Sequence, residues 1–153
     1  MTQPEIRALV DNLDEAFDRK AWHGPNLRNS IRGVTAVQAA WRPKPGQHNI
    51  WELTLHAAYW KYVVRRKLTG AKRGAFALKG SNFFPRPVGE PREVDWKADI
   101  AILESEHRSP RAAVATLAST SPRIPHLIRG AAAHDVYHAG QIRLPRRPRE
   151  DSD

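Results

Sequence analysis

Two histidines four residues apart, His134 and His138, have the spacing in this chain that points most directly to chemistry. They lie in the run HDVYHAGQI. If this run is helical, the two residues lie one turn apart on the same face, so both imidazoles can bind one metal ion. Neutral imidazole is a ligand for zinc, nickel, iron and copper. Two ligands are seldom enough, so the remaining sequence has to supply a third.

The third ligand is expected upstream of this pair, because the residues after His138 offer only Gln141 and a few acids in an Arg- and Pro-rich tail. The run is only superficially similar to the HExxH motif of zinc proteases, since Asp135 stands in place of the glutamate that acts as general base. The upstream candidates are His23, His48, His56, His107 and His126. We favour His56, because it lies in NIWELTLHAAYWKYVVRRKL, a segment without Gly or Pro that can form a rigid helix. A second helix carrying the pair could pack against it.

The composition predicts a single globular domain in the cytoplasm. A chain of 153 residues can bury one sizeable core, and 41% apolar with 27% charged residues is typical of soluble proteins. No stretch approaches the roughly 20 apolar residues of a membrane span, and the N-terminus does not resemble a secretory signal. Because the chain has no cysteine, a metal must be held by nitrogen and oxygen, and a thiol reagent must come from outside.

The net charge of +9 raises the question of nucleic-acid binding. Much of the excess lies in residues 65–92 and 143–149, while the first expected helix is rich in acids. This distribution argues against a dedicated site for nucleic acid, and strong basicity alone discriminates poorly between functions.

Four long helices are expected from apolar residues at spacings of three and four. They cover residues 2–17, about 50–68, from about 95 onward, and about 125–144. Pro110 is expected to kink the third helix or make it restart. The segment 22–45, with several Gly and Pro, permits only short helical turns. We therefore predict an all-α four-helix bundle over residues 1–144, followed by a basic, mobile tail at 145–153.

Two parts of this plan bear on partners and on substrate access. The helix at 50–68 has apolar stripes on two sides, so it must be buried on two sides, and a second copy of the chain is a candidate for the outer cover. The connection at 69–91 is longer than those inside bundles normally are. It contains Phe76, Phe83 and Phe84, and it either closes over a site or caps the core.

The order of these elements resembles the DinB/YfiT-like superfamily of metalloenzymes. The likeness rests on a helical histidine in IWELTLHAAYW followed much later by RGAAAHDVYHAGQI, and it extends from WHGPNL through KGSNFFPRP to HAGQI. The resemblance implies a four-helix bundle with a long crossover between its second and third helices, and frequent homodimerisation. It also implies a divalent metal bound by His56, His134 and His138.

Three imidazoles leave at least one coordination position open, as catalytic metal sites do. Family members with known activity include transferases that use low-molecular-weight thiols such as mycothiol and bacillithiol, and others with isomerase or hydrolase-like roles. We therefore expect a metal-dependent transferase that combines such a thiol with a small-molecule substrate. The alternatives are a metal-dependent hydrolase and a non-catalytic module that binds metal or a small ligand. Zinc or nickel is the favoured ion, and iron or manganese is also compatible with three nitrogen ligands.

Metal-binding imidazoles normally donate their second N–H to a carboxylate or a carbonyl. Glu52, Asp135 and Gln141 are the candidates for these outer partners, and no catalytic residue can be assigned beyond them. Each has a simpler alternative, because Glu52 can complete a helix cap, Asp135 can pair with an arginine, and Gln141 can bond to a neighbouring helix. We interpret His107 and His126 as hydrogen-bonded core residues.

Overall fold

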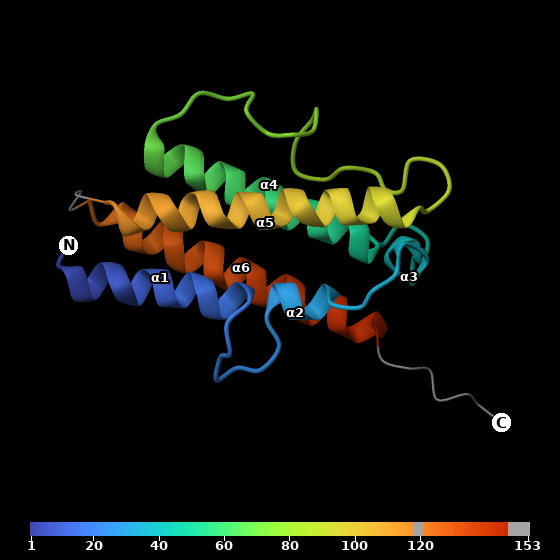
Figure 1. The fold of residues 1–153 in the computed structure, drawn as a ribbon, viewed down its shortest axis with the longest axis horizontal. Coiled ribbons are helices and arrows are strands. Elements are labelled where there is room, and N and C mark those ends of the chain that lie inside the picture. Colours follow the sequence, from blue (N-terminus) through green and yellow to red (C-terminus); the bar gives the residue numbers. More distant parts are fainter. Residues whose placement is uncertain (118–120, 147–153) are drawn as a thin grey trace.

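The computed structural model describes residues 1–117 and 121–146, and helices are the only regular elements in this part of the chain. The helices are α1 (Gln3–Phe17), α2 (Leu27–Ile31), α3 (Ala36–Ala40), α4 (Ile50–Thr69), α5 (Glu93–Ala115) and α6 (Arg123–Arg146). The prediction of an all-α chain is confirmed. Figure 1 shows α1, α4, α5 and α6 as four long rods, with the short α2 and α3 in the connector between α1 and α4. None of the described helices is long and apolar enough to cross a membrane.

Capping side chains determine where α1 and α4 begin. Thr2 accepts a hydrogen bond from the N–H of Glu5, and the Glu5 carboxylate accepts from the N–H of Thr2. Asn49 and Glu52 make the same reciprocal pair at the start of α4, with 2.8 Å between the Glu52 nitrogen and Asn49 Oδ1. Such boxes satisfy backbone N–H groups that the first turn of a helix leaves free. Both starts agree with the sequence prediction.

Pro110 lies inside α5, which continues through it from Glu93 to Ala115. The expectation that the helix restarts at this residue is therefore wrong. A proline inside a helix removes one backbone hydrogen bond, a cost that tertiary packing can offset. Pro110 is buried, and α5 packs against α4 over much of its length.

The last helix is longer than predicted at both ends. It begins at Arg123 and ends at Arg146, so Pro145 lies in its final turn. Residues 145 and 146, assigned to the tail from the sequence, are therefore helical. Helix boundaries commonly shift by one or two residues, and a proline near the end breaks few hydrogen bonds. Residues 147–153 lie outside the described part of the chain.

The helices α4 and α5 are neighbours that run in the same direction (Figure 1). Two adjacent parallel helices cannot be joined by a tight turn, because the chain must return along the full length of the first one. Residues 70–92 make this return along the outer side of the pair (Figure 1). Gly70 ends α4 in the left-handed conformation, with φ of 70°, which glycine adopts at little cost.

One of the two apolar stripes of α4 is fully buried within a single chain. This stripe consists of Trp51, Leu55, Ala58 and Tyr62, each at most 3% exposed. The Trp51 indole donates to Asp99 of α5, with 2.7 Å between Nε1 and Oδ2. The second stripe of α4 is thus no argument for a dimer, because α5 and the connecting segments already cover it.

Candidate metal centre

Three imidazoles from two helices converge on one point. His56 lies on α4, while His134 and His138 lie one turn apart on α6. The Nε2 atom of His134 is 3.2 Å from Nε2 of His56 and 3.0 Å from Nε2 of His138. The three candidate ligand atoms all lie within 4.8 Å of one another. Sequence reasoning had placed these three side chains together, and they are close enough to bind one metal ion.

Hydrogen bonds on the far side of two rings determine which nitrogen points inward with a lone pair. His56 Nδ1 is 3.0 Å from the carbonyl oxygen of Asn82, and His138 Nδ1 is 2.6 Å from Oε1 of Gln141. These oxygens can only accept, so in each neutral ring Nδ1 carries the hydrogen and Nε2 carries the lone pair. The tautomers that result direct their Nε2 lone pairs toward the centre of the cluster.

The surroundings keep all three rings neutral at ordinary pH. Burial lowers the pKa of His56 to about 4, against the opposing effect of the Asn82 carbonyl. Burial also lowers the pKa of His134 to about 3, and the repulsion that a proton on His134 would meet from a protonated His138 or His56 and from Lys61 lowers it further. The pKa of His138 is lowered by burial too. Metal ligation requires neutral imidazole, so protons compete weakly here.

The distances between the nitrogens fit a bound cation. Zinc binds histidine nitrogen at about 2.0–2.1 Å in tetrahedral geometry, which places two ligand nitrogens about 3.3 Å apart. The observed 3.0 and 3.2 Å are close to that spacing. When His134 also carries its hydrogen on Nδ1, all three Nε2 atoms are unprotonated and their lone pairs repel at this distance. A cation at their centre would turn this repulsion into attraction.

The segment between α4 and α5 supplies one wall of the site. The ring of Phe83 stacks on the His56 imidazole, with 4.1 Å between centroids and 9° between planes. The neighbouring Asn82 bonds His56 through its carbonyl oxygen and accepts from the indole of Trp60 through its side chain, at 3.0 Å. The segment was expected either to close over a site or to cap the core. Residues 82 and 83 lie over the histidine site, whereas Phe84, which is 4% exposed, caps the core.

The three candidate outer partners have different surroundings. Gln141 contacts the histidine cluster (His56, His134 and His138) through its hydrogen bond with His138. Asp135 points instead to Lys61, with which it forms a buried ion pair, and its Oδ1 has no partner among the described residues. Asp135 thus pairs with a lysine from α4 and not with an arginine. A backbone oxygen, that of Asn82, takes the place next to His56, and no side-chain pattern in the sequence could have indicated it.

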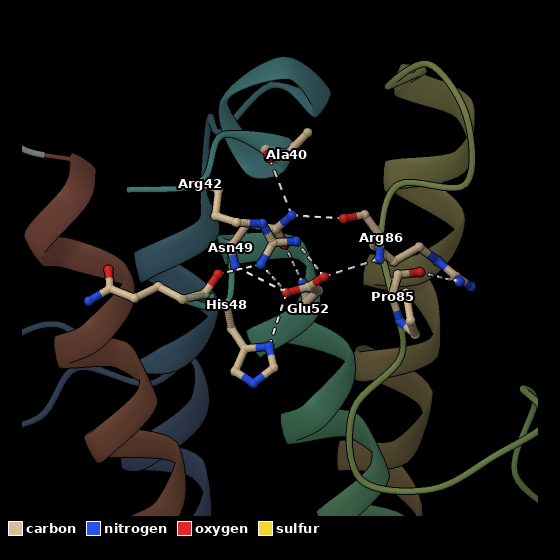
Figure 2. Close-up of polar contacts among 8 residues, drawn as sticks. Ala40, Arg42, His48, Asn49, Glu52, Pro85 and Arg86 are labelled. Carbon is tan, nitrogen blue, oxygen red and sulfur yellow. Dashed lines mark hydrogen bonds and ion pairs between the residues drawn. The ribbon is translucent and has the colours of Figure 1, made fainter. Parts of the chain in front are cut away.

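Glu52 belongs to a separate polar cluster at the start of α4 (Figure 2). Its carboxylate accepts two hydrogen bonds from Arg42, at 2.7 and 2.9 Å, and lies 3.0 Å from Nδ1 of His48. It also accepts from the backbone N–H of Arg86 and of Asn49. Glu52 therefore joins the connector, the cap of α4 and the segment that carries Asn82 and Phe83, and the hydrogen bonds of its carboxylate to described residues do not reach the histidine cluster.

The four remaining upstream histidines lie outside the cluster. His23 and His126 are exposed, so the expectation of a core histidine is wrong for His126. It is confirmed for His107, which is 4% exposed and stacks on Phe17. The His48 ring stacks on the Phe83 ring, with 3.7 Å between centroids. His48 therefore supports the ring that covers His56.

Comparisons with protein-family profiles, with curated proteins and with solved structures found no match for this chain.

A first prediction concerns the pH dependence of stability that Glu52 causes. Burial alone would raise the pKa of its carboxyl, but hydrogen bonds from Arg42, His48 and two backbone N–H groups lower the pKa to about 2. A depressed pKa stabilises the folded chain above the unfolded value, near 4.5. That stability is lost as the pH falls from there toward 2. We expect Glu52→Gln to lower the free energy of unfolding at pH 7 by about 2 kcal/mol.

Urea unfolding between pH 3 and pH 7 measures this effect. The difference between wild type and Glu52→Gln should shrink steadily below pH 4.5. Glu104→Gln is the matched control, because Glu104 pairs with Arg28 at 2.7 Å but about a third of each side chain is exposed. The control should cost less than about 1 kcal/mol. Equal losses in both variants at every pH would contradict the assignment.

A second prediction concerns Gln141. Loss of an outer hydrogen bond to a metal-binding histidine typically weakens metal affinity 10- to 100-fold. We expect Gln141→Leu to weaken zinc binding by about tenfold in a competition titration, while Gln141→Glu, which keeps an oxygen acceptor for His138 Nδ1, should bind at least as tightly as wild type. Full affinity in Gln141→Leu would show that the hydrogen bond does not orient His138.

Proposed function

We propose that this chain is a divalent-metal enzyme of the DinB/YfiT-like type, a transferase that uses a low-molecular-weight thiol. The observation that carries the proposal is the convergence of three neutral imidazoles, whose Nε2 atoms approach to 3.0 and 3.2 Å. The ligand set is His56, His134 and His138. Zinc or nickel is the favoured ion, with iron or manganese as alternatives.

The assignment to this family has support from the arrangement of the helices. We propose that α1, α4, α5 and α6 form a four-helix bundle and that residues 70–92 are its crossover. The parallel course of α4 and α5 (Figure 1) is what such a connection requires. The two ligand-bearing helices, α4 and α6, are in contact, as in bundles that build metal sites from facing helices. A homodimer remains part of the proposal on the strength of the resemblance alone.

When bound, a divalent ion with three protein ligands supplies a Lewis acid that lowers the pKa of a thiol or a water molecule at its open position. The protein contributes the surroundings. Phe83 excludes water from one face of His56, and the Asn82 carbonyl and Gln141 hold two rings in the tautomer that presents Nε2. Trp60 lies beside both His56 and His134, with ring centroids 6.4 and 6.3 Å away.

A thiol is the preferred nucleophile because characterised members of the family that this chain resembles use one, and it has to be a cosubstrate because the chain contains no cysteine. In the proposed reaction the sulfur of the external thiol forms a bond to an electrophilic carbon of the substrate. The bond from this carbon to its leaving group breaks, and the thiol proton leaves with that group. A metal-dependent hydrolase, in which water takes the place of the thiol, is the second candidate, because the same open site serves it. A non-catalytic binding module is the third.

The metal content of the protein tests the ligand set. We expect protein purified without chelator to contain about one divalent ion per chain by elemental analysis, and His56→Ala to bind zinc more than about 100-fold more weakly. His23→Ala is the matched control, because His23 is exposed and lies in the connector. Equal metal content in wild type and His56→Ala would rule out His56 as a ligand.

Turnover assays separate the candidate reactions. The metal-loaded protein is incubated with varied electrophiles, with and without a bacterial thiol, and both thiol consumption and substrate loss are followed. The transferase predicts substrate loss only when the thiol is present, and His134→Ala should abolish it. Substrate loss without thiol would favour the hydrolase, while the absence of turnover with every metal would favour the binding module.

A further inference from the structure

A cavity of about 830 Å³ opens between the outer side of α4 and the segment that follows it. One wall is formed by α4 residues between Tyr59 and Lys67, and the other by residues 73–81. Trp60, whose ring lies near His56 and His134, forms part of the first wall. The cavity thus reaches the side of α4 that carries the histidine cluster, although no residue of the cluster lines it.

Among the residues that the structure describes, four basic side chains line this cavity and no carboxylate does. They are Arg66, Lys67, Arg73 and Lys79. None of the four forms an ion pair with a carboxylate in the described part of the chain. Basic residues elsewhere on the surface do find such partners, as Arg92 does with Asp95 at 2.7 Å. Like charges gathered around one hollow create a positive potential that attracts an anion.

Contacts between the two walls hold the cavity open in a defined shape. The hydroxyl of Tyr62 accepts a hydrogen bond from the N–H of Gly74 at 3.0 Å. Arg66 Nε donates to the carbonyl of Ala71 at 3.3 Å. Phe76 packs against Tyr59 and Tyr62, with ring centroids 5.5 and 5.4 Å apart. Because these bonds already attach the segment to α4, a ligand need not order it on binding, which lowers the entropic cost.

Aromatic side chains add a second kind of recognition. Tyr59, Trp60, Tyr62 and Phe76 all line the cavity, and Trp60 is 39% exposed. Such rings bind flat apolar groups by stacking and edge contacts. A site that combines cations lacking a carboxylate partner in the described chain with the partly exposed Trp60 ring fits a molecule with both an anionic group and a flat apolar part.

We propose that this cavity binds a small organic anion, a molecule with a phosphate or carboxylate group joined to an aromatic or similarly flat body. The cations Arg66, Lys67, Arg73 and Lys79 bind the anionic group, and Trp60 with its aromatic neighbours binds the flat part. This assignment goes beyond the proposed transferase, because it defines a binding site that needs no metal. If both hold, the ligand of this cavity lies beside the metal centre across Trp60.

Calorimetric titration at low ionic strength tests the proposal with three probes. They are 1-naphthyl phosphate, which has both features, 1-naphthol, which lacks the charge, and inorganic phosphate, which lacks the ring. We expect naphthyl phosphate to bind at least tenfold more tightly than either of the others. Its affinity should fall as salt is added, since screening weakens exposed charge interactions.

A double variant, Arg73→Gln with Lys79→Gln, removes two exposed cations from the cavity. We expect it to weaken naphthyl phosphate binding about tenfold. The matched control is Lys72→Gln with Lys97→Gln, which removes the same net charge from exposed positions outside the cavity lining and should change the affinity less than twofold. Circular dichroism checks that both variants keep their helices.

Several outcomes would overturn the proposal. Equal losses in the two double variants would mean that only the net charge matters, and naphthol binding as tightly as naphthyl phosphate would remove the role of the cations. A single-stranded oligonucleotide that binds far more tightly, and loses affinity in the cavity variant, would assign these cations to nucleic acid instead. Protein stripped of metal and dialysed free of chelator should bind naphthyl phosphate unchanged, so failure of the metal model leaves this result intact.

Discussion

The parallel packing of α4 and α5 is the constraint on which the rest of this structure depends. Because the two helices lie side by side and run in the same direction, residues 70–92 have to return along the outside of the pair (Figure 1). That return places Asn82 and Phe83 against His56 and forms the outer wall of the basic cavity. A short turn between antiparallel helices would have left His56 without its hydrogen-bond acceptor and its aromatic cover.

The polar cluster around Glu52 helps to hold residues 70–92 in one defined position. The segment 70–92 has no regular secondary structure, so its position depends on anchors at particular residues. One anchor is the hydrogen bond between Gly74 and Tyr62, and another is Arg86, whose N–H and carbonyl bond Glu52 and Asn49 (Figure 2). A helix cap at the start of α4 thereby helps to position groups that lie next to a histidine on the following turn. The segment that supplies the Asn82 carbonyl to His56 is thus bonded to the cap of α4 through Arg86.

Buried charge is the second unusual feature of the interior. Lys61 of α4 pairs with Asp135 of α6 and also lies 3.3 Å from Nδ1 of His107. Desolvating two charges is expensive, and their attraction commonly repays the cost only in part. The pair does, however, fix the relative position of the two helices that carry the histidine cluster, since Asp135 adjoins His134. The positive charge of Lys61 also contributes to the low pKa of His134.

Local patterns in the sequence were sufficient for the starts of α1 and α4 and for the pair His134 and His138, while the choice of His56 among five upstream histidines rested also on the family resemblance. Capping boxes at Thr2 and Asn49 act over three residues, and the four-residue spacing of His134 and His138 is a property of any helix. The helix α5 does not restart at Pro110, because packing along α5 outweighs one lost hydrogen bond. The lysine that pairs with Asp135, 74 residues away in sequence, and the Asn82 carbonyl beside His56 depend on how the helices and the return segment pack. Contacts between residues so far apart are determined by the relative placement of whole helices, which no local pattern encodes.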